Sequence, residues 1–283
     1  MAKEEYAGLI RPMKVRAGVQ KLPDTAVLSE AIASLPSWKL DLDFCVLLLL
    51  SPLLAPLMLA IAAFIKLTSR GPVIFRQARV GYRGSLFVCY KFRSMHVGAD
   101  TAIHQRHVEN VIQSGAPMTK LDSEEDGRLI RGGGFLRATG LDELPQVFNI
   151  LKGEMSLVGP RPCLPFEFDK YTDHSRHRFD TVPGVTGLWQ VSGKNHTTFD
   201  EMIAYDLQYL RERSLRLDLW IMVRTLPVLL KQVAATIQAK WSKLRRNLAG
   251  SQRASQPASL KRNQAPQRSD STSQKCPSPK QFA

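Results

Sequence analysis

The longest apolar segment of the chain runs from residue 44 to residue 65, and no charged side chain interrupts these 22 residues. A helix of about 20 apolar residues can cross the hydrocarbon core of a bilayer. Ser51 and Pro52 lie within the segment, and a proline inside a helix removes a backbone hydrogen bond and bends the helix. The pattern therefore predicts a membrane helix over residues 38–68 that is broken at Ser51 and Pro52.

Basic residues flank this segment on both sides. Lys3, Arg11, Lys14, Arg16, Lys21 and Lys39 precede it, and Lys66, Arg70, Arg76, Arg79 and Arg83 follow it. Because basic flanks are retained on the cytoplasmic side of a membrane, a re-entrant helix that enters and leaves on that side accounts for both flanks. Ser51 can then supply a partner for a backbone group that the break leaves free. A membrane-spanning helix is the alternative interpretation.

Shorter patterns predict the other elements. Residues 1–37 lack sustained periodicity, which predicts a flexible N-terminal arm. Two β-rich runs, residues 73–76 and 85–90, are joined through a glycine-containing turn and predict a hairpin. Helices are expected around the proline of FLRATGLDELPQVFNILKG, and the polar stretch EFDKYTDHSRHRFD predicts a surface helix. Two further helices are expected near residues 198–214 and 215–231.

The last predicted helix continues into a basic amphipathic stretch over residues 233–248. Its apolar positions recur at helical spacing, and the intervening positions are basic: Val233, Ile237, Trp241, Leu244 and Leu248 against Lys240, Lys243, Arg245 and Arg246. This pattern is typical of a helix lying on an anionic membrane surface, although a solvated terminal helix packed on the core is the alternative. Residues 249–283 are rich in Ser, Gln, Pro, Lys and Arg, which predicts a disordered basic tail.

Composition narrows the range of partners. The 283 residues carry 39 Lys and Arg against 25 Asp and Glu, a net charge of +14, which favours an anionic partner. Nucleic acid, a phosphorylated substrate and acidic lipid all fit this balance. The four cysteines form no CxxC pair, so the sequence supports neither a disulfide framework nor a zinc site. The absence of GxxxxGK[ST] excludes a P-loop nucleotide triphosphatase.

The candidate chemistry centres on two adjacent carboxylates, Asp142 and Glu143, in the first turn of a predicted helix. Leu141, Leu144, Val147, Phe148 and Leu151 would form the apolar face of that helix. Helix capping and the helix dipole explain many carboxylates at such positions. Adjacent helical side chains point about 100° apart, however, so the pair can serve two neighbouring roles. One carboxylate could attack a substrate while the other holds a hard cation.

Anion-binding features surround this pair in the sequence. Lys91, Arg93, Arg131, Arg137 and Arg161 lie in or near the same motifs, and the GPRP and PGVTG segments are expected to expose backbone amides. A carboxylate nucleophile that faces a diphosphate needs Mg²⁺ to offset charge repulsion and arginines to hold phosphoryl oxygens. The sequence thus predicts a site for phosphate chemistry.

The same residues resemble the bacterial sugar transferase family, the small monotopic polyprenyl-phosphate hexose-1-phosphate transferases. The resemblance lies in LDFCVLLLLSPLLAPLMLA, GPVIFRQARVG, FVCYKFRSM, FLRATGLDELPQVFNILKGEMSLVGPRP, PGVTGLWQVSGKN and YDLQYLRERSLRLDLWIM. It implies a mainly α fold with a small β-hairpin, a re-entrant helix, interfacial amphipathic helices and a catalytic domain over residues 69–232. It also implies the inner membrane as location, with the active site on the cytoplasmic face.

The resemblance implies a two-step reaction. Asp142 would attack the β-phosphate of a UDP-sugar and release UMP, and undecaprenyl phosphate would then accept the sugar phosphate. Glu143 matches the residue that holds Mg²⁺, and the substrate-binding assignments are Lys91, Arg93, Arg137, Arg161, Gln190 and Asn195. Inner-membrane lipids are expected partners, nucleic acid is not, and homo-oligomer formation is left open. Gly127 and Lys194 depart from the family pattern, and Lys194 replaces a bidentate arginine with a point charge.

Two other functions fit part of the sequence. A non-enzymatic membrane-surface adaptor would explain the charge and the amphipathic helix, but not the carboxylate pair. A membrane-bound Mg²⁺-dependent phosphohydrolase would also use carboxylates and arginines. Such enzymes gather more carboxylates around two metals than this motif offers.

Overall fold

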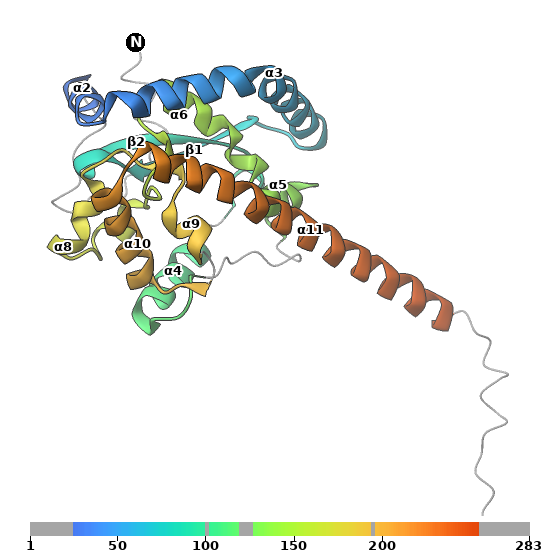
Figure 1. Cartoon of the computed structure of the whole chain (residues 1–283). Helices are drawn as coiled ribbons and strands as arrows, with labels where there is room; N and C mark the ends of the chain where they lie inside the picture. Colours follow the sequence, from blue (N-terminus) through green and yellow to red (C-terminus); the bar gives the residue numbers. More distant parts are fainter. Residues whose placement is uncertain (1–24, 100–101, 119–126, 194–195, 255–283) are drawn as a thin grey trace, which may run out of the picture. The chain divides into compact units, whose positions relative to one another are not determined.

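The computed structural model describes residues 25–99, 102–118, 127–193 and 196–254, and helices dominate it (Figure 1). The chain divides into two compact units, residues 1–236 and residues 237–283. The described elements, in chain order, are α2 (Thr25–Ala33), α3 (Ser37–Thr68), β1 (Ile74–Val80), η1 (Tyr82–Gly84), β2 (Leu86–Phe92), α4 (Ala102–Ser114), α5 (Gly133–Thr139), η2 (Leu141–Gln146), α6 (Val147–Leu151), β3 (Ser156–Val158), α7 (Pro165–Phe168), α8 (Asp173–Arg176), η3 (His177–Phe179), β4 (Gly184–Thr186), α9 (Leu188–Ser192), α10 (Phe199–Glu212) and α11 (Leu215–Ala254).

The predicted hairpin is confirmed, with longer strands than the sequence indicated. Strands β1 and β2 pair antiparallel, with Ile74 opposite Phe92 and Val80 opposite Leu86. A second, parallel pair of strands, β3 and β4, was not predicted. Each of these strands has only three residues, which is too short for an alternating pattern to be visible. Their backbones approach so closely that a Cβ on Gly184 would lie 2.0 Å from the Gly159 nitrogen.

Helix α3 is continuous from Ser37 to Thr68, so it is not interrupted at Ser51 and Pro52 as the sequence predicted. Pro52 lies inside the helix and has no N–H to donate to the Leu48 carbonyl. The Ser51 hydroxyl donates to that carbonyl instead, at 2.8 Å, as the sequence predicted. Figure 1 shows the ribbon of α3 changing direction along its length. The carbonyl that Pro52 leaves without a donor is therefore satisfied by the residue that precedes the proline.

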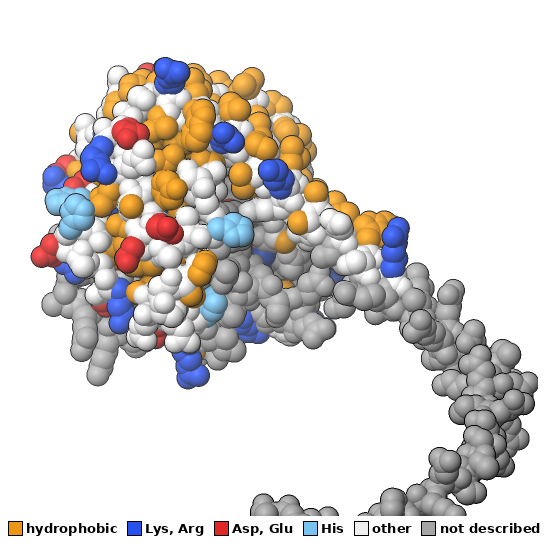
Figure 2. Space-filling view, turned by 60° about the horizontal axis from the view of Figure 1, so that its bottom comes forward, with side chains coloured by type: hydrophobic (Ala, Val, Ile, Leu, Met, Phe, Trp, Pro, Cys, Tyr) orange, Lys and Arg blue, Asp and Glu red, His pale blue; other side chains and the backbone are white. Residues whose placement is uncertain are grey.

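One face of α3 packs on the hairpin and on the helices beyond it, and the opposite face is exposed. Leu47 packs with Phe87 and Cys89, while Ile61 and Ile65 pack in the cluster around Phe92. The exposed face carries large apolar side chains, namely Phe44, Leu48, Leu49, Leu53, Leu59 and Leu67. Hydrophobic side chains gather on the upper part of the surface in Figure 2. By length and composition, α3 and residues 215–238 of α11 could enter a membrane.

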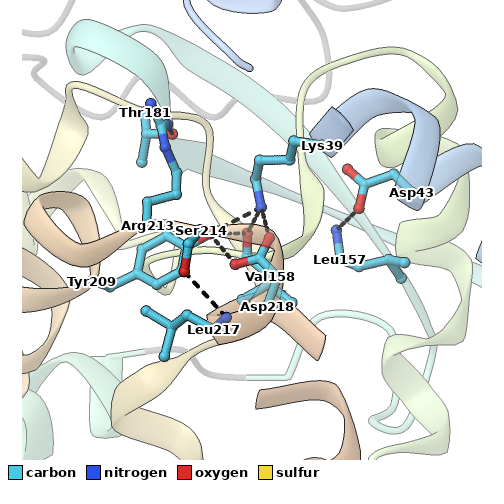
Figure 3. Close-up of polar contacts among 10 residues, drawn as sticks. All are labelled: Lys39, Asp43, Leu157, Val158, Thr181, Tyr209, Arg213, Ser214, Leu217 and Asp218. Carbon is cyan, nitrogen blue, oxygen red and sulfur yellow. Dashed lines mark hydrogen bonds and ion pairs between the residues drawn. The ribbon is translucent and has the colours of Figure 1, made fainter. Parts of the chain in front are cut away.

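A buried ion pair fixes the beginning of α3 to the rest of the first unit (Figure 3). Lys39 Nζ donates to Asp218 Oδ2 at 2.5 Å, to the Tyr209 hydroxyl at 2.9 Å and to the Val158 carbonyl at 2.8 Å. The Tyr209 hydroxyl donates to Asp218 Oδ1 at 2.9 Å. One turn further along α3, Asp43 accepts from the Leu157 backbone N–H at 3.0 Å. The cluster joins α3 to β3, α10 and α11.

Three further predictions differ from the structure. The arm predicted over residues 1–37 contains helix α2 from Thr25 to Ala33, because Ala31 is buried in a cluster with Tyr82 and Val182; residues 1–24 lie outside the described part. Helix α11 extends to Ala254, into the region predicted to be a disordered tail. The surface helix predicted in EFDKYTDHSRHRFD is instead three short helices, because Phe168, Tyr171 and Phe179 turn into the core. In the second unit, Ile237 and Trp241 are exposed.

The buried ion pair predicts a specific pattern of stabilities. Lys39→Met leaves the Asp218 carboxylate buried and uncompensated, so we expect it to lower the free energy of unfolding by about 3–5 kcal/mol. Denaturant unfolding of the detergent-solubilised protein measures this change. The double variant Lys39→Met/Asp218→Leu should recover much of the loss, since it removes both charges. Arg176→Met, which breaks an exposed pair with Asp173, should lower the free energy of unfolding by about 1 kcal/mol or less. Equal losses in Lys39→Met and Arg176→Met would contradict the prediction.

Candidate active site

The two adjacent carboxylates lie on η2, a tight helical turn between α5 and α6. Gly140 lies between α5 and η2 and has φ 74° and ψ 6°, a left-handed conformation that glycine adopts without strain. Leu141 and Leu144 pack against the cluster that holds the second part of α3. The turn is therefore anchored by apolar contacts to the membrane helix.

Asp142 and Glu143 occupy different environments. The Asp142 residue is 7% exposed, whereas the Glu143 side chain is 32% exposed and accepts from Lys91 Nζ of β2 at 2.8 Å. The structure thus brings together Glu143 and one of the basic residues predicted for the site. One carboxylate is therefore shielded from water, and the other faces a cation.

The apolar face predicted for this helix is partly wrong. Phe148 and Leu151 are 48% and 62% exposed. A 3-10 turn advances with 3.0 residues per turn and an α-helix with 3.6. Because η2 precedes α6, the face buried at Leu141 and Leu144 is rotated away by the time the chain reaches Phe148.

Asn149 docks α6 on the hairpin. Its amide nitrogen donates to the Val88 carbonyl and to Glu154 Oε2, both at 2.7 Å, and its amide oxygen accepts from the Tyr90 backbone N–H at 3.0 Å. The residue is fully buried. Beside it, Lys152 Nζ donates to the Tyr90 hydroxyl at 2.7 Å. Asn149 thus makes the kind of hydrogen bonds with β2 that a neighbouring strand would make. These bonds hold α6 against β2, and η2, which precedes α6, lies beside Lys91.

The GPRP turn lies near the same centre. Burial raises the pKa of the Cys89 thiol, while the charges of Lys91, Arg79 and Arg161 lower that pKa and the charge of Glu143 raises it. Cys89 packs in one cluster with Leu157 of β3, the strand that leads into the GPRP turn, and with Val147 and Ile150 of α6. The GPRP turn therefore follows a strand that packs beside α6, the helix that continues η2.

The backbone amides expected to be exposed in GPRP and PGVTG are used within the fold. The Gly159 N–H donates to the Thr186 carbonyl and the Gly184 N–H donates to the Pro160 carbonyl, both at 2.9 Å. The two segments form the extended β3–β4 pairing, which consumes these donors. The expectation is therefore wrong for these two amides.

The remaining predicted residues are placed as follows. Arg93 is buried and donates to the Arg70 and Ser69 carbonyls at 2.7 and 2.9 Å, so it holds the chain after α3. Gln190 donates to the Val185 carbonyl at 2.9 Å, and its own oxygen is buried without a partner among the described residues. Arg137 lies half-buried in the last turn of α5. Asn195 and Lys194 lie outside the described residues.

The carboxylates can be tested for their fit to Mg²⁺. Among the residues that the structure describes, no group of three or more His, Cys, Asp or Glu side chains could enclose a metal ion. Mg²⁺ commonly takes one or two protein carboxylates and completes its shell with substrate phosphates and water. The part-exposed carboxylate of Glu143 fits this second mode.

Several residues that shape the site were missed by sequence reasoning. Asn149 stood out as the polar member of the apolar run VFNIL, and Lys39 and Asp43 as charges spaced four apart on one face of a membrane helix. Both signals were available. The sequence offers no sign that Arg79 and Arg178 would be buried, at 5% and 1% exposure.

Comparison with known proteins gives consistent matches. The profile of a family described as "Bacterial sugar transferase" matches residues 36–232. The galactosyl transferase CpsE of Streptococcus agalactiae serotype III (strain NEM316) is 47% identical over 161 residues, which cover 56% of this chain and 35% of that protein. The undecaprenyl-phosphate galactose phosphotransferase of Salmonella typhimurium is 40% identical over 165 residues, covering 58% of this chain and 35% of that protein.

A shorter relative is covered more fully. The exopolysaccharide production protein ExoY of Sinorhizobium fredii is 34% identical over 189 residues, which cover 67% of this chain and 84% of that protein. The alignments therefore span about a third of the length of the first two relatives and most of the length of the third.

The docking role of Asn149 predicts a pH-dependent defect. In Asn149→Asp a new carboxylate faces Glu154, whose pKa burial already raises. The pKa values of both acids in the folded state should then exceed their unfolded values, so stability falls as pH rises through them. We expect a loss of about 1–3 kcal/mol at neutral pH that shrinks toward pH of about 5.

Denaturant unfolding at both pH values measures this effect. Asn149→Ala removes the same hydrogen bonds without adding an acid, so it should recover less stability at the lower pH. An Asn149→Asp deficit that is the same at both pH values would exclude a close approach to Glu154.

Proposed function

Because the chain belongs to the bacterial sugar transferase family, we propose that it transfers a sugar 1-phosphate from a UDP-sugar to undecaprenyl phosphate. The observation that carries the proposal is the ion pair of Glu143, the neighbour of Asp142, with Lys91 within the matched region. Relatives named for such reactions include the UDP-glucose:undecaprenyl-phosphate glucose-1-phosphate transferase of Xanthomonas campestris, which is 43% identical over 188 residues, covering 64% of this chain and 36% of that protein.

Asp142 is the proposed nucleophile. One of its carboxylate oxygens attacks the β-phosphorus of the donor, the bond from that phosphorus to the bridging oxygen breaks, and UMP leaves. A phosphate oxygen of undecaprenyl phosphate then attacks the same phosphorus and releases the carboxylate. The partial burial of Asp142 supports this role, because a carboxylate with few water contacts is a stronger nucleophile toward a bound phosphate.

Glu143 is proposed to hold Mg²⁺ together with phosphate oxygens of the donor, and a bound Mg²⁺ would offset negative charge on the transferred phosphate. Lys91 keeps the Glu143 carboxylate oriented through their ion pair. Lys91 and Arg161 are both placed to attract phosphate oxygens to this region. Arginine is suited to the role because its planar fork can hold two oxygens at once.

We also propose that α3 is re-entrant in the bacterial inner membrane, with the active site on the cytoplasmic face. A straight helix of 32 residues would be about 48 Å long. Lys39 at its beginning, Leu47 further along and Ile65 near its end all contact the first unit. Contact along the whole helix supports a shallow insertion, because a spanning helix would carry its two ends to opposite sides of the bilayer.

Acidic lipids of the membrane surface are proposed as further partners of the C-terminal region. Residues 233–283, beyond the family match, contain ten Lys and Arg residues and one acidic residue. Most of the net charge of +14 therefore lies outside the region that the transfer reaction requires. A basic segment that follows an apolar helix is attracted to an anionic bilayer surface.

Covalent labelling tests the nucleophile. We expect purified protein incubated with Mg²⁺ and β-³²P-labelled UDP-glucose or UDP-galactose, without lipid acceptor, to retain label on the protein and to release UMP. Asp142→Asn should do neither, because an amide cannot displace UMP. Asp173→Asn, which changes an exposed carboxylate in α8, serves as the matched control and should label normally.

The outcomes separate the candidate functions. Undecaprenyl phosphate should remove the label from the wild-type protein and yield a labelled lipid. Continuous release of sugar phosphate without lipid would indicate a phosphohydrolase. Full turnover by Asp142→Asn would rule out the proposed intermediate, and the absence of UMP release with a panel of UDP-sugars would leave only a non-enzymatic role.

Cysteine accessibility tests the membrane topology. Ser37→Cys places a thiol at the first residue of α3, and Ser69→Cys places one at the residue that follows its end. A re-entrant helix predicts that neither thiol reacts with a membrane-impermeant maleimide in intact spheroplasts and that both react after lysis. The unaltered chain controls for its own cysteines. Labelling of one of the two positions in intact spheroplasts would establish a spanning helix.

A further inference from the structure

Two buried arginines hold the backbone of the GPRP turn (residues 159–162). Arg178 Nη2 donates to the Arg161 carbonyl at 2.9 Å, and Arg79 Nη1 donates to the Pro162 carbonyl at 3.0 Å. Arg178 comes from η3 and Arg79 from β1, so the turn is held from two separate elements.

Backbone donors hold the carbonyls on either side. The Pro160 carbonyl accepts from the Gly184 N–H at 2.9 Å, and the Cys163 carbonyl accepts from the Val80 N–H at 3.0 Å. Four consecutive carbonyls, from residue 160 to residue 163, therefore each accept a hydrogen bond from a fixed donor. The backbone at this turn has little freedom to move.

The two arginines are themselves locked in place. Arg178 is 1% exposed, forms an ion pair with Asp206 and donates to the Tyr171 hydroxyl. Arg79 is 5% exposed and also donates to Gln77 Oε1 at 3.0 Å. Burying a guanidinium group is costly, so two such groups at one turn indicate that its conformation matters.

The side chain of Arg161 is the part of the turn that remains available. It is half-buried and makes no hydrogen bond or ion pair with any residue that the structure describes. The turn follows β3, whose Leu157 packs in one cluster with Cys89 of β2 and with Val147 of α6, the helix that continues the turn bearing the two carboxylates. A fixed backbone beneath an available guanidinium is the arrangement expected of a preorganised anion contact.

We propose that Arg79 and Arg178 are positioning residues that hold the GPRP turn, so that the Arg161 guanidinium is fixed where it contacts the diphosphate of the nucleotide donor. The proposal rests on the proposed function only in requiring that the donor carry a nucleoside diphosphate. Neither Arg79 nor Arg178 contacts the donor directly. Both act through Arg161.

Binding of UDP to the full-length protein in detergent, measured by calorimetry with Mg²⁺ present, tests this coupling without turnover. Loss of a hydrogen bond to a charged group corresponds to about 10- to 100-fold in affinity, and we expect weakening of that order in Arg161→Gln. Arg79→Met should weaken UDP binding by a similar factor. The double variant should bind UDP within about twofold of Arg161→Gln alone, since Arg79 has nothing left to position.

Arg93→Met is the matched control. Like Arg79, Arg93 is buried and donates to the backbone. Its partners are the Arg70 and Ser69 carbonyls, so it does not hold the GPRP turn. Any effect of Arg93→Met on UDP affinity should therefore add to that of Arg161→Gln in full. Uridine, which lacks phosphate, should bind the wild type and Arg79→Met equally.

Arg79→Lys separates position from charge and serves as well if Arg79→Met fails to fold. Lysine keeps the charge but cannot hold Pro162 and Gln77 together, so we expect it to retain most of the loss of UDP affinity. Full rescue by lysine, or additive losses in the Arg79→Met/Arg161→Gln double variant, would overturn the positioning role.

The result is distinguishable from a failure of the proposed transfer. If UDP affinity depends on Arg79 through Arg161 while no UMP is released from any UDP-sugar, the positioning role stands and the transfer reaction is wrong. If UMP is released normally but Arg161→Gln leaves UDP affinity unchanged, the transfer stands and the positioning role is wrong.

Discussion

The buried ion pair between Lys39 and Asp218 is the contact on which the arrangement of the first unit depends. Lys39 belongs to the apolar helix α3, and its partners come from β3, α10 and α11. A charge this deep is stable only when its partners are fixed, so the pair specifies a single position for the beginning of α3. The apolar contacts of Leu47, Ile61 and Ile65 then determine the course of the rest of the helix.

This arrangement carries the candidate site to the membrane helix. The cluster that buries Ile61 and Ile65 also holds Leu141 and Leu144 of η2, the turn that bears the two carboxylates. From the other side, Asn149 fixes α6 against β2, which carries Lys91. The carboxylates are thus held between α3 and the hairpin. Such a position suits a reaction between a water-soluble donor and an acceptor whose phosphate lies at the bilayer surface.

The arginines in and around the candidate site differ in what their side chains contact. Arg93, Arg79 and Arg178 are buried and donate to backbone carbonyls, whereas the half-buried Arg161 side chain makes no hydrogen bond or ion pair with the described residues. A guanidinium group has five donors in a rigid fork and suits both tasks, because carbonyl and phosphate oxygens accept in similar ways. The buried arginines hold the backbone in place, and Arg161 is the arginine proposed to contact the donor.

The sequence by itself determined the elements whose signal is local. The 22-residue apolar run predicted α3, the glycine-containing turn predicted the hairpin, and the motif around Asp142 and Glu143 predicted the family. These features depend on neighbouring residues, so the order of residues is enough to reveal them.

Only the tertiary structure decided which polar residues are buried and what they contact. Lys39 meets Asp218 across 179 positions of sequence, and Arg79 meets Pro162 across 83. The exposure of Phe148 depends on the change from a 3-10 turn to an α-helix, and the β3–β4 pairing on two glycines from distant segments. The physical reason is that hydrogen bonding and desolvation depend on distances in space, which the spacing of residues along the chain does not determine.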